Sequence, residues 1–142
     1  MTYVTKQLAI KLKQAGFDVP VFGRYYQLID DNKIYYSLSA KNHSYSPVNV
    51  ANDNTVKDVF VSAPTLYEVT DWLRERHGLH VVAEFIITHE EWAYCIQNLK
   101  TGQFNTQNQN LTGWSYAEAL AAGIEHAVDE VLKRMNNGLE QQ

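Results

Sequence analysis

LYEVTDWLRERHGLHVVAEFIITHEEWAYCIQNL, residues 66–99, contains a helical pattern followed by two strand-like runs around a polar turn. The apolar side chains of the helical part repeat at helical spacing and form one stripe: Leu66, Val69, Trp72 and Leu73. Gly78 is placed to end this helix. Apolar and polar residues then alternate over 81–88 and over 92–99, on either side of His89-Glu90-Glu91. This stretch therefore predicts a helix followed by an antiparallel hairpin.

Similar elements occur on both sides of this stretch. Upstream, residues 4–15 have a helical stripe closed by Gly16, and residues 24–40 alternate around Asp30-Asp31-Asn32. Downstream, Ser115 and Glu118 have the spacing of a capping box at the start of a long amphipathic helix. The predicted fold class is α+β, in the order α-β-β-(β)-α-β-β-α. We expect a mainly antiparallel sheet of four or five strands, packed by three helices.

The chain length of 142 residues fits a single α+β domain over residues 1–142. Residues 41–57 are rich in turn formers and predict an irregular excursion. Residues 103–110 are uncharged and rich in amides, which is typical of a solvated loop. Asn136-Asn137-Gly138 is expected to end the last helix, so that 136–142 form a frayed tail.

Composition excludes several classes of protein. Hydrophobic residues make up 45% of the chain, which is typical of a folded protein. The net charge is −4, and this disfavours nonspecific binding of duplex DNA. No signal-peptide pattern opens the chain, and Cys95 is the only cysteine, so a cytoplasmic location is expected. The apolar runs are far shorter than a membrane helix requires, and no contact with a membrane is expected.

Three groups of residues are candidates for chemistry. His77 and His80 lie three residues apart, but two imidazoles leave a zinc site short of ligands. His89-Glu90-Glu91 has the residue types of an acid–base pair, and Cys95 is a candidate nucleophile. Each group has a simpler interpretation as a helix end, a solvated turn or a packed side chain. The sequence therefore predicts no catalytic residue, no metal site and no cofactor; a cryptic hydrolase using His89, Glu90 or Cys95 is the third-ranked hypothesis.

The first hairpin carries tyrosines among cations, and its candidate binding residues are Arg24, Tyr25, Lys33 and Tyr35. Exposed aromatic rings beside cations can stack the bases of a single-stranded nucleic acid. The same residue types also mark protein interfaces. Adjacent tyrosines on a strand point to opposite faces, so part of this set is expected in the core. Single-stranded nucleic-acid binding is the second-ranked hypothesis.

A resemblance lies in PTLYEVTDWLRE at 64–75 and SYAEALAAGIEHA at 115–127. These stretches resemble small uncharacterised bacterial proteins of prophage or mobile-element type, and the outline is similar to phage-associated α/β sandwich domains. The resemblance implies a fold and a genomic setting, and it brings no catalytic residues. The first-ranked hypothesis is thus a non-catalytic accessory protein of phage type that acts through protein contacts, with a homodimer as one expected form.

Overall fold

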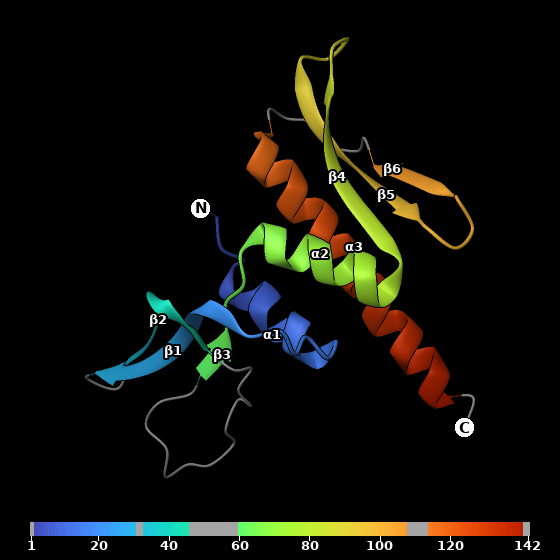
Figure 1. Cartoon of the computed structure of the whole chain (residues 1–142). Coiled ribbons are helices and arrows are strands. Elements are labelled where there is room, and N and C mark those ends of the chain that lie inside the picture. Colours follow the sequence, from blue (N-terminus) through green and yellow to red (C-terminus); the bar gives the residue numbers. More distant parts are fainter. Residues whose placement is uncertain (1, 31–32, 46–59, 108–113, 141–142) are drawn as a thin grey trace. The chain divides into compact units, whose positions relative to one another are not determined.

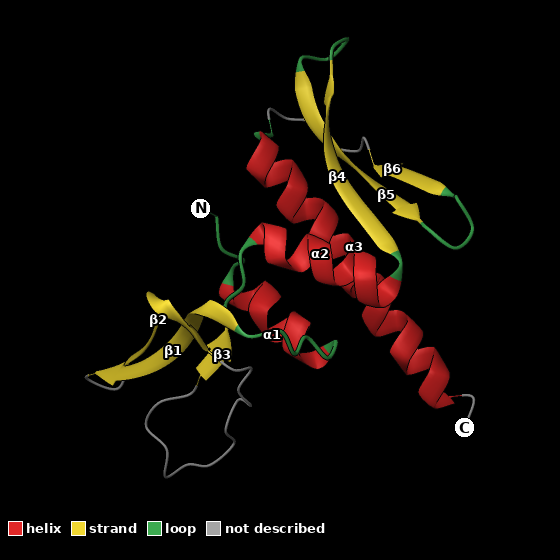
Figure 2. Cartoon of the chain, in the orientation of Figure 1, coloured by secondary structure: helices red, strands yellow, loops and turns green. Residues whose placement is uncertain are grey.

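The computed structural model describes residues 2–30, 33–45, 60–107 and 114–140. The described chain has three helices and six strands, with three strands after each of the first two helices (Figures 1 and 2). In order they are α1 (Lys6–Gln14), β1 (Val21–Asp30), β2 (Lys33–Tyr45), β3 (Phe60–Ser62), α2 (Leu66–His77), β4 (Leu79–Ile86), β5 (Glu91–Asn98), β6 (Phe104–Gln107) and α3 (Tyr116–Glu140). The predicted α+β class is confirmed.

The chain divides into two compact units. Unit 1 spans Tyr3–Thr65, and unit 2 spans Leu66–Gln142 together with Thr2. Each unit contains one antiparallel sheet of three strands, with the order β2-β1-β3 in unit 1 and β4-β5-β6 in unit 2. The sequence predicts one sheet of four or five strands, whereas the described residues form two sheets with six strands in total. Whether residues 1–142 unfold as one domain stays a prediction.

Unit 1 begins with a helix that has a defined cap at each end. The Leu8 backbone N–H donates to Thr5 Oγ1 at 3.2 Å, which makes Thr5 the N-cap. At the other end Gly16 has a φ of 88°, Gly16 N–H donates to the Lys13 carbonyl and Phe17 N–H donates to the Leu12 carbonyl. These bonds form a Schellman motif and bury Phe17, as the Gly16-Phe17 pair predicts.

The unit 1 sheet depends on a close approach of two strands. Gly23 in β1 and Ala63 just after β3 share a backbone hydrogen bond of 2.9 Å, from the Ala63 N–H to the Gly23 carbonyl. A Cβ added at Gly23 would lie 2.4 Å from the Ala63 carbonyl oxygen. Only glycine fits at this position without displacing the backbone. The β1–β2 hairpin itself was predicted and is confirmed.

Unit 2 packs α3 against β4 and β5. Gly123 permits this contact, because a Cβ there would lie 2.8 Å from Tyr94 Cβ and 2.8 Å from Val81 Cγ1. The helix starts with the predicted capping box, in which Ser115 N–H donates to Glu118 Oε1 and Glu118 N–H donates to Ser115 Oγ, both at 3.1 Å. The core of the unit consists of side chains with almost no exposure: Val69, Leu73, Ile124, Val128 and Val131.

Three predicted boundaries differ from the structure. β2 continues to Tyr45, so 41–45 are not part of an irregular excursion, and 46–57 lie outside the described residues. Residues 104–107 of the expected amide-rich loop form β6, because pairing with β5 satisfies their backbone groups. α3 continues to Glu140, because Gly138 does not adopt the left-handed conformation that would end a helix. Over the described residues, no helix is both long enough and apolar enough to cross a membrane.

Candidate interaction surface

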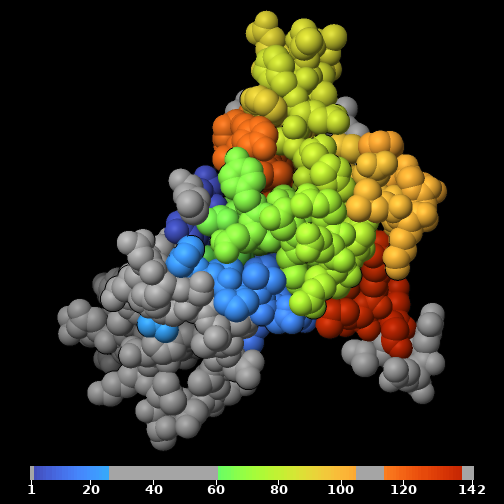
Figure 3. Space-filling model, viewed as in Figure 1, coloured from blue at the N-terminus to red at the C-terminus, as the bar shows by residue number. Residues whose placement is uncertain are grey.

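The β4–β5 hairpin of unit 2 is packed at its base and exposed at its tip. One face of β4 shows the change: Val81 is 4% exposed, Ala83 is half-buried and Phe85 is 49% exposed. Ile87, just past the strand, is 80% exposed. Since α3 begins only at Tyr116, the end of the hairpin extends beyond the helix that covers its base (Figures 1 and 3).

The tip is a short turn that follows directly from the sequence pattern. His89 N–H donates to the Ile86 carbonyl at 3.1 Å, and Glu90 N–H donates to the Ile87 carbonyl at 3.3 Å. Glu90 has a φ of 52°, the left-handed conformation that closes the turn. The predicted turn His89-Glu90-Glu91 is confirmed for His89 and Glu90, whereas Glu91 is the first residue of β5. This turn leaves the side chain of Ile87 at the outermost end of the apolar face.

A row of aromatic contacts leads from the tip to the helices. The Phe85 and Trp92 rings meet edge to face with centroids 5.4 Å apart, and Trp92 meets Tyr116 in the same way at 5.1 Å. Tyr67 of α2 is a close electrostatic neighbour of the Tyr116 hydroxyl. Desolvation by partial burial, then the neighbouring Tyr67, raises the pKa of Tyr116. Edge-to-face contacts of this kind hold the rings in fixed positions at the surface.

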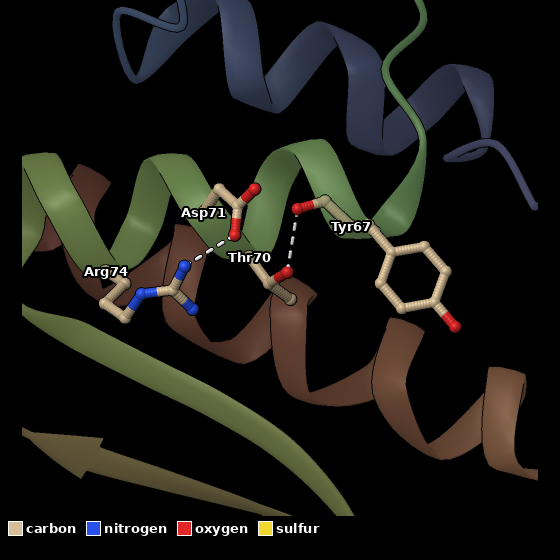
Figure 4. Close-up of polar contacts among 4 residues, drawn as sticks. All are labelled: Tyr67, Thr70, Asp71 and Arg74. Carbon is tan, nitrogen blue, oxygen red and sulfur yellow. Dashed lines mark hydrogen bonds and ion pairs between the residues drawn. The ribbon is translucent and has the colours of Figure 1, made fainter.

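The ring of Tyr67 is exposed, and the hydrogen bond that Tyr67 forms with Thr70 in α2 uses its backbone carbonyl. Figure 4 shows the Thr70 hydroxyl donating to the Tyr67 carbonyl, 2.8 Å away, while the ring extends away from the helix. Further along α2, Arg74 Nη2 donates to Asp71 Oδ1 at 2.6 Å. The Tyr67 side chain is 58% exposed, and that of Tyr116 is 40% exposed.

Together these side chains form what we call the arm surface: Tyr67, Phe85, Ile87, Trp92 and Tyr116. Aromatic residues held on a rigid support are typical of the centres of protein interfaces. One exposed carboxylate, that of Glu90, belongs to the same turn as Ile87. Glu84 is also exposed, but it alternates with Phe85 and therefore lies on the opposite face of β4. The arm surface can therefore bury apolar area against a partner while placing negative charge at the rim.

The residues proposed from sequence for the first hairpin are divided by the sheet register. Arg24 pairs with Ser39 and Tyr25 pairs with Leu38, so the alternation of the ladder puts positions 24, 33 and 35 on one face and position 25 on the other. Tyr25 is half-buried and its hydroxyl donates to the Val4 carbonyl at 2.7 Å; burial raises its pKa. Tyr25 thus stabilises unit 1. The side chains of Lys33 and Tyr35 lie outside the described residues.

The other sequence candidates are not brought together. Cys95 is buried in β5, and Glu91 at the start of that strand is roughly 14 Å away at about 3.4 Å per residue. The His77 ring packs edge to face on Trp72 with centroids 4.6 Å apart, at the end of α2. Among the residues whose placement is described, no three His, Cys, Asp or Glu side chains form a group that could hold a metal ion.

Sequence reasoning missed the arm surface because alternation places Val81, Ala83, Phe85 and Ile87 on one face without showing how far that face is covered. The alternation is correct for the strand, but burial stops where α3 stops. The late start of that helix, marked by Ser115 and Glu118, was the available signal. Comparison with known protein families, with curated proteins and with solved structures found no match to the chain.

Proposed function

We propose that this protein acts without catalysis, by binding another protein through the arm surface. The observation that supports this most is Ile87, an isoleucine that is 80% exposed at the end of a hairpin whose aromatic residues contact one another. Exposing such a residue gives no folding stability, whereas burying it against a partner contributes roughly 2 kcal/mol. We propose, in addition, that this binding serves the accessory role expected of a phage-type protein.

The charges around the arm surface favour a partner with a basic rim. The exposed Glu90 lies in the turn that carries Ile87. A symmetric dimer formed tip to tip would bring the Glu90 carboxylates of two copies close together, and like charges at an interface oppose association. A different protein with Lys or Arg around an apolar pocket would complement both the apolar side chains and the negative charge of the arm surface. The homodimer expected from the sequence is the competing form.

The test compares two variants that each place a charge on an exposed apolar side chain. Ile87→Asp changes the arm surface, and Leu99→Asp changes an exposed leucine at the turn after β5. Proteins captured from extracts of the native host by the unaltered chain should be lost with Ile87→Asp and retained with Leu99→Asp. For a purified partner, Ile87→Asp should weaken binding by about 2 kcal/mol, roughly thirtyfold.

Two outcomes contradict this proposal. Capture that is equally strong with both variants would show that the partner binds elsewhere. Light scattering that gives a dimer mass for the unaltered chain and a monomer mass for Ile87→Asp would show that the arm surface joins two copies. Melting curves of both variants, expected to agree with the unaltered chain to within a few degrees, ensure that the comparison concerns binding alone.

A second candidate function is single-stranded nucleic-acid binding by unit 1. It is supported by the register, which places positions 24, 33 and 35 on one face of the β1–β2 hairpin. Retention on an immobilised single-strand oligonucleotide should then fall with rising salt and be lost in the double variant Lys33→Ala, Tyr35→Ala. Tyr25→Phe should keep this retention, since the Tyr25 hydroxyl binds the Val4 carbonyl. Retention that survives the double variant would rule out this site.

A further inference from the structure

A pocket of about 220 Å³ lies in unit 2, away from the arm surface. It is bordered by α3 on one side and by the start of β4, the end of β5 and the start of β6 on the other. Pockets for drug-sized ligands have volumes of roughly 300–1,000 Å³. The ligand that fits here is consequently a small one, with the size of a single amino acid.

The α3 side of the pocket presents charges of both signs. His126, Glu130 and Arg134 follow one another at four-residue intervals and share one face of the helix. Arg134 Nε lies 3.7 Å from Glu130 Oε1, and Arg134 Nη1 donates to the His77 carbonyl at 3.4 Å. These two contacts orient the guanidinium group. They involve only part of its five N–H donors, so it retains donors for a carboxylate.

Neutral polar groups add donors beside the charges. Asn98 Oδ1 accepts hydrogen bonds from the backbone N–H groups of Lys100, at 3.0 Å, and Thr101, at 3.3 Å. Its amide nitrogen is thus the end left for a ligand. The Tyr94 hydroxyl lies 2.8 Å from His126 Nδ1, and burial raises the pKa of Tyr94, so this hydroxyl keeps its proton. The contact fixes the His126 ring at the pocket.

Besides Asn98 and Gln103, the strand side of the pocket carries three apolar side chains. Leu79 and Ile96 are buried, and Phe104 of β6 is 66% exposed at its border. An aliphatic group placed here would cover the Phe104 ring and leave water. The pocket therefore combines a positive group, a negative group one helical turn away, and an apolar wall.

We propose that this pocket binds a free α-amino acid with an aliphatic side chain. The ligand carboxylate accepts from Arg134 and Asn98, its ammonium group donates to Glu130, and its side chain packs on Leu79, Ile96 and Phe104. Glu130 and Arg134 form an ion pair with each other, so a simple anion or cation would contact one member and be repelled by the other. A zwitterion can contact both members at once, and the small volume limits its size. This inference does not depend on the proposed function of the arm surface.

The test is a titration of the ¹⁵N-labelled full chain with L-leucine, followed by amide chemical shifts. Saturable shifts around Asn98 and His126 are expected at concentrations up to about 10 mM, the range suited to a small ligand. Arg134→Gln should weaken binding about tenfold, because it removes a charge-assisted contact. Lys133→Gln removes the neighbouring cation, which does not line the pocket, and should leave binding unchanged.

Two leucine analogues decide whether the zwitterion is recognised. 4-Methylpentanoate lacks the ammonium group and isopentylamine lacks the carboxylate, so each should bind at least about tenfold more weakly than leucine. Glu130→Gln should weaken leucine binding while improving that of 4-methylpentanoate. Equal binding of leucine and either analogue, or shifts that do not saturate, would overturn the proposal. So would leucine binding that is the same in Arg134→Gln.

Discussion

Unit 1 and unit 2 each contain a β-hairpin, but the third strand pairs with a different strand of the hairpin in each unit. β3 pairs with β1, the first strand of its hairpin, whereas β6 pairs with β5, the second strand of its own. The connections explain this difference. Only a short turn joins Asn98 to Phe104, which forces β6 beside β5, whereas the long segment between Tyr45 and Phe60 allows β3 to reach the far strand. Similar local patterns thus produce different sheets.

The largest expected losses of stability come from substitutions in the cores of the two units. Leu12 in unit 1 and Leu73 in unit 2 are both almost fully buried. Replacing either by alanine removes apolar contacts and leaves a cavity, so each variant should lose about 2–5 kcal/mol of unfolding free energy. Chemical denaturation followed by circular dichroism measures the loss, and amide hydrogen exchange shows where it occurs.

Amide hydrogen exchange in Leu12→Ala and Leu73→Ala tests the prediction of a single domain. If the chain unfolds as one domain, each variant lowers the protection of the most stable amides in both units by the same amount. If the units unfold separately, Leu12→Ala affects unit 1 alone and Leu73→Ala affects unit 2 alone. Leu99→Ala, at an exposed leucine, is the control and should cost less than about 0.5 kcal/mol.

The second prediction concerns the glycine that allows close packing in each unit. Gly23→Ala places a Cβ 2.4 Å from a backbone oxygen, and Gly123→Ala places one 2.8 Å from side-chain carbons. Overpacking of this kind costs about 1–3 kcal/mol, and Gly23→Ala should be the more harmful because backbone cannot move aside cheaply. Thermal melting of the two variants ranks them.

Gly138→Ala supplies the control for these glycines. It lies in α3 with no atom near its Cβ position, so alanine should stabilise the helix by about 0.5–1 kcal/mol. A loss of stability at Gly138, or neutral substitutions at both Gly23 and Gly123, would contradict the close packing described for the units.

The third prediction compares the helix caps. Thr5 caps α1 in unit 1 with one hydrogen bond, and Ser115 caps α3 in unit 2 as half of a reciprocal pair. Alanine at either position should cost about 1 kcal/mol, measured by urea denaturation. Thr5→Ser and Ser115→Thr retain the hydroxyl and should restore most of the loss. Failure of the hydroxyl to restore stability would mean that the caps are not responsible.

Most of the local structure could be predicted from the sequence because its causes are local. Gly16 and Gly78 end helices in the left-handed conformation, and Ser115 with Glu118 starts one. The β6 strand could not be predicted, since its amide-rich residues become a strand only by pairing with β5. The division into two sheets also depends on pairings between distant segments, which periodicity does not encode.

The candidate sites were harder to predict than the fold. Tyr25 was placed in a binding set by composition, but its hydroxyl has a structural partner in Val4. Alternation puts Phe85 and Ile87 on the same face as Val81, but it does not give the extent of the helix that covers this face. Glu130 and Arg134 lie on a helix, and the sequence pattern of that helix does not indicate a pocket. The pocket exists because β4, β5 and β6 lie beside the helix.

The smallest expected effect concerns the last turns of the helices in the two units. The last turn of α1 carries Lys11 and Lys13, whereas that of α2 carries His77 beside Arg74 and Arg76. Partial burial, then Arg134 and Arg76, lowers the pKa of His77 below its usual value of 6.5. The folded state therefore binds fewer protons than the unfolded state in the range just below pH 6.5. Stability from this source is fully present above pH 6.5 and declines as pH falls toward the folded-state pKa.

His77→Gln should accordingly reduce the loss of stability between about pH 7 and pH 5.5, where a free histidine titrates. The comparison is made with denaturation midpoints at the two pH values. Arg134→Gln removes one of the causes of the lowered pKa, and it should reduce the same loss by a smaller amount because burial remains. His89→Gln, at the exposed hairpin turn, is the matched control. An NMR titration that places the pKa of His77 at or above 6.5 in the folded chain would contradict this account, because protonation would then not oppose folding at the end of α2.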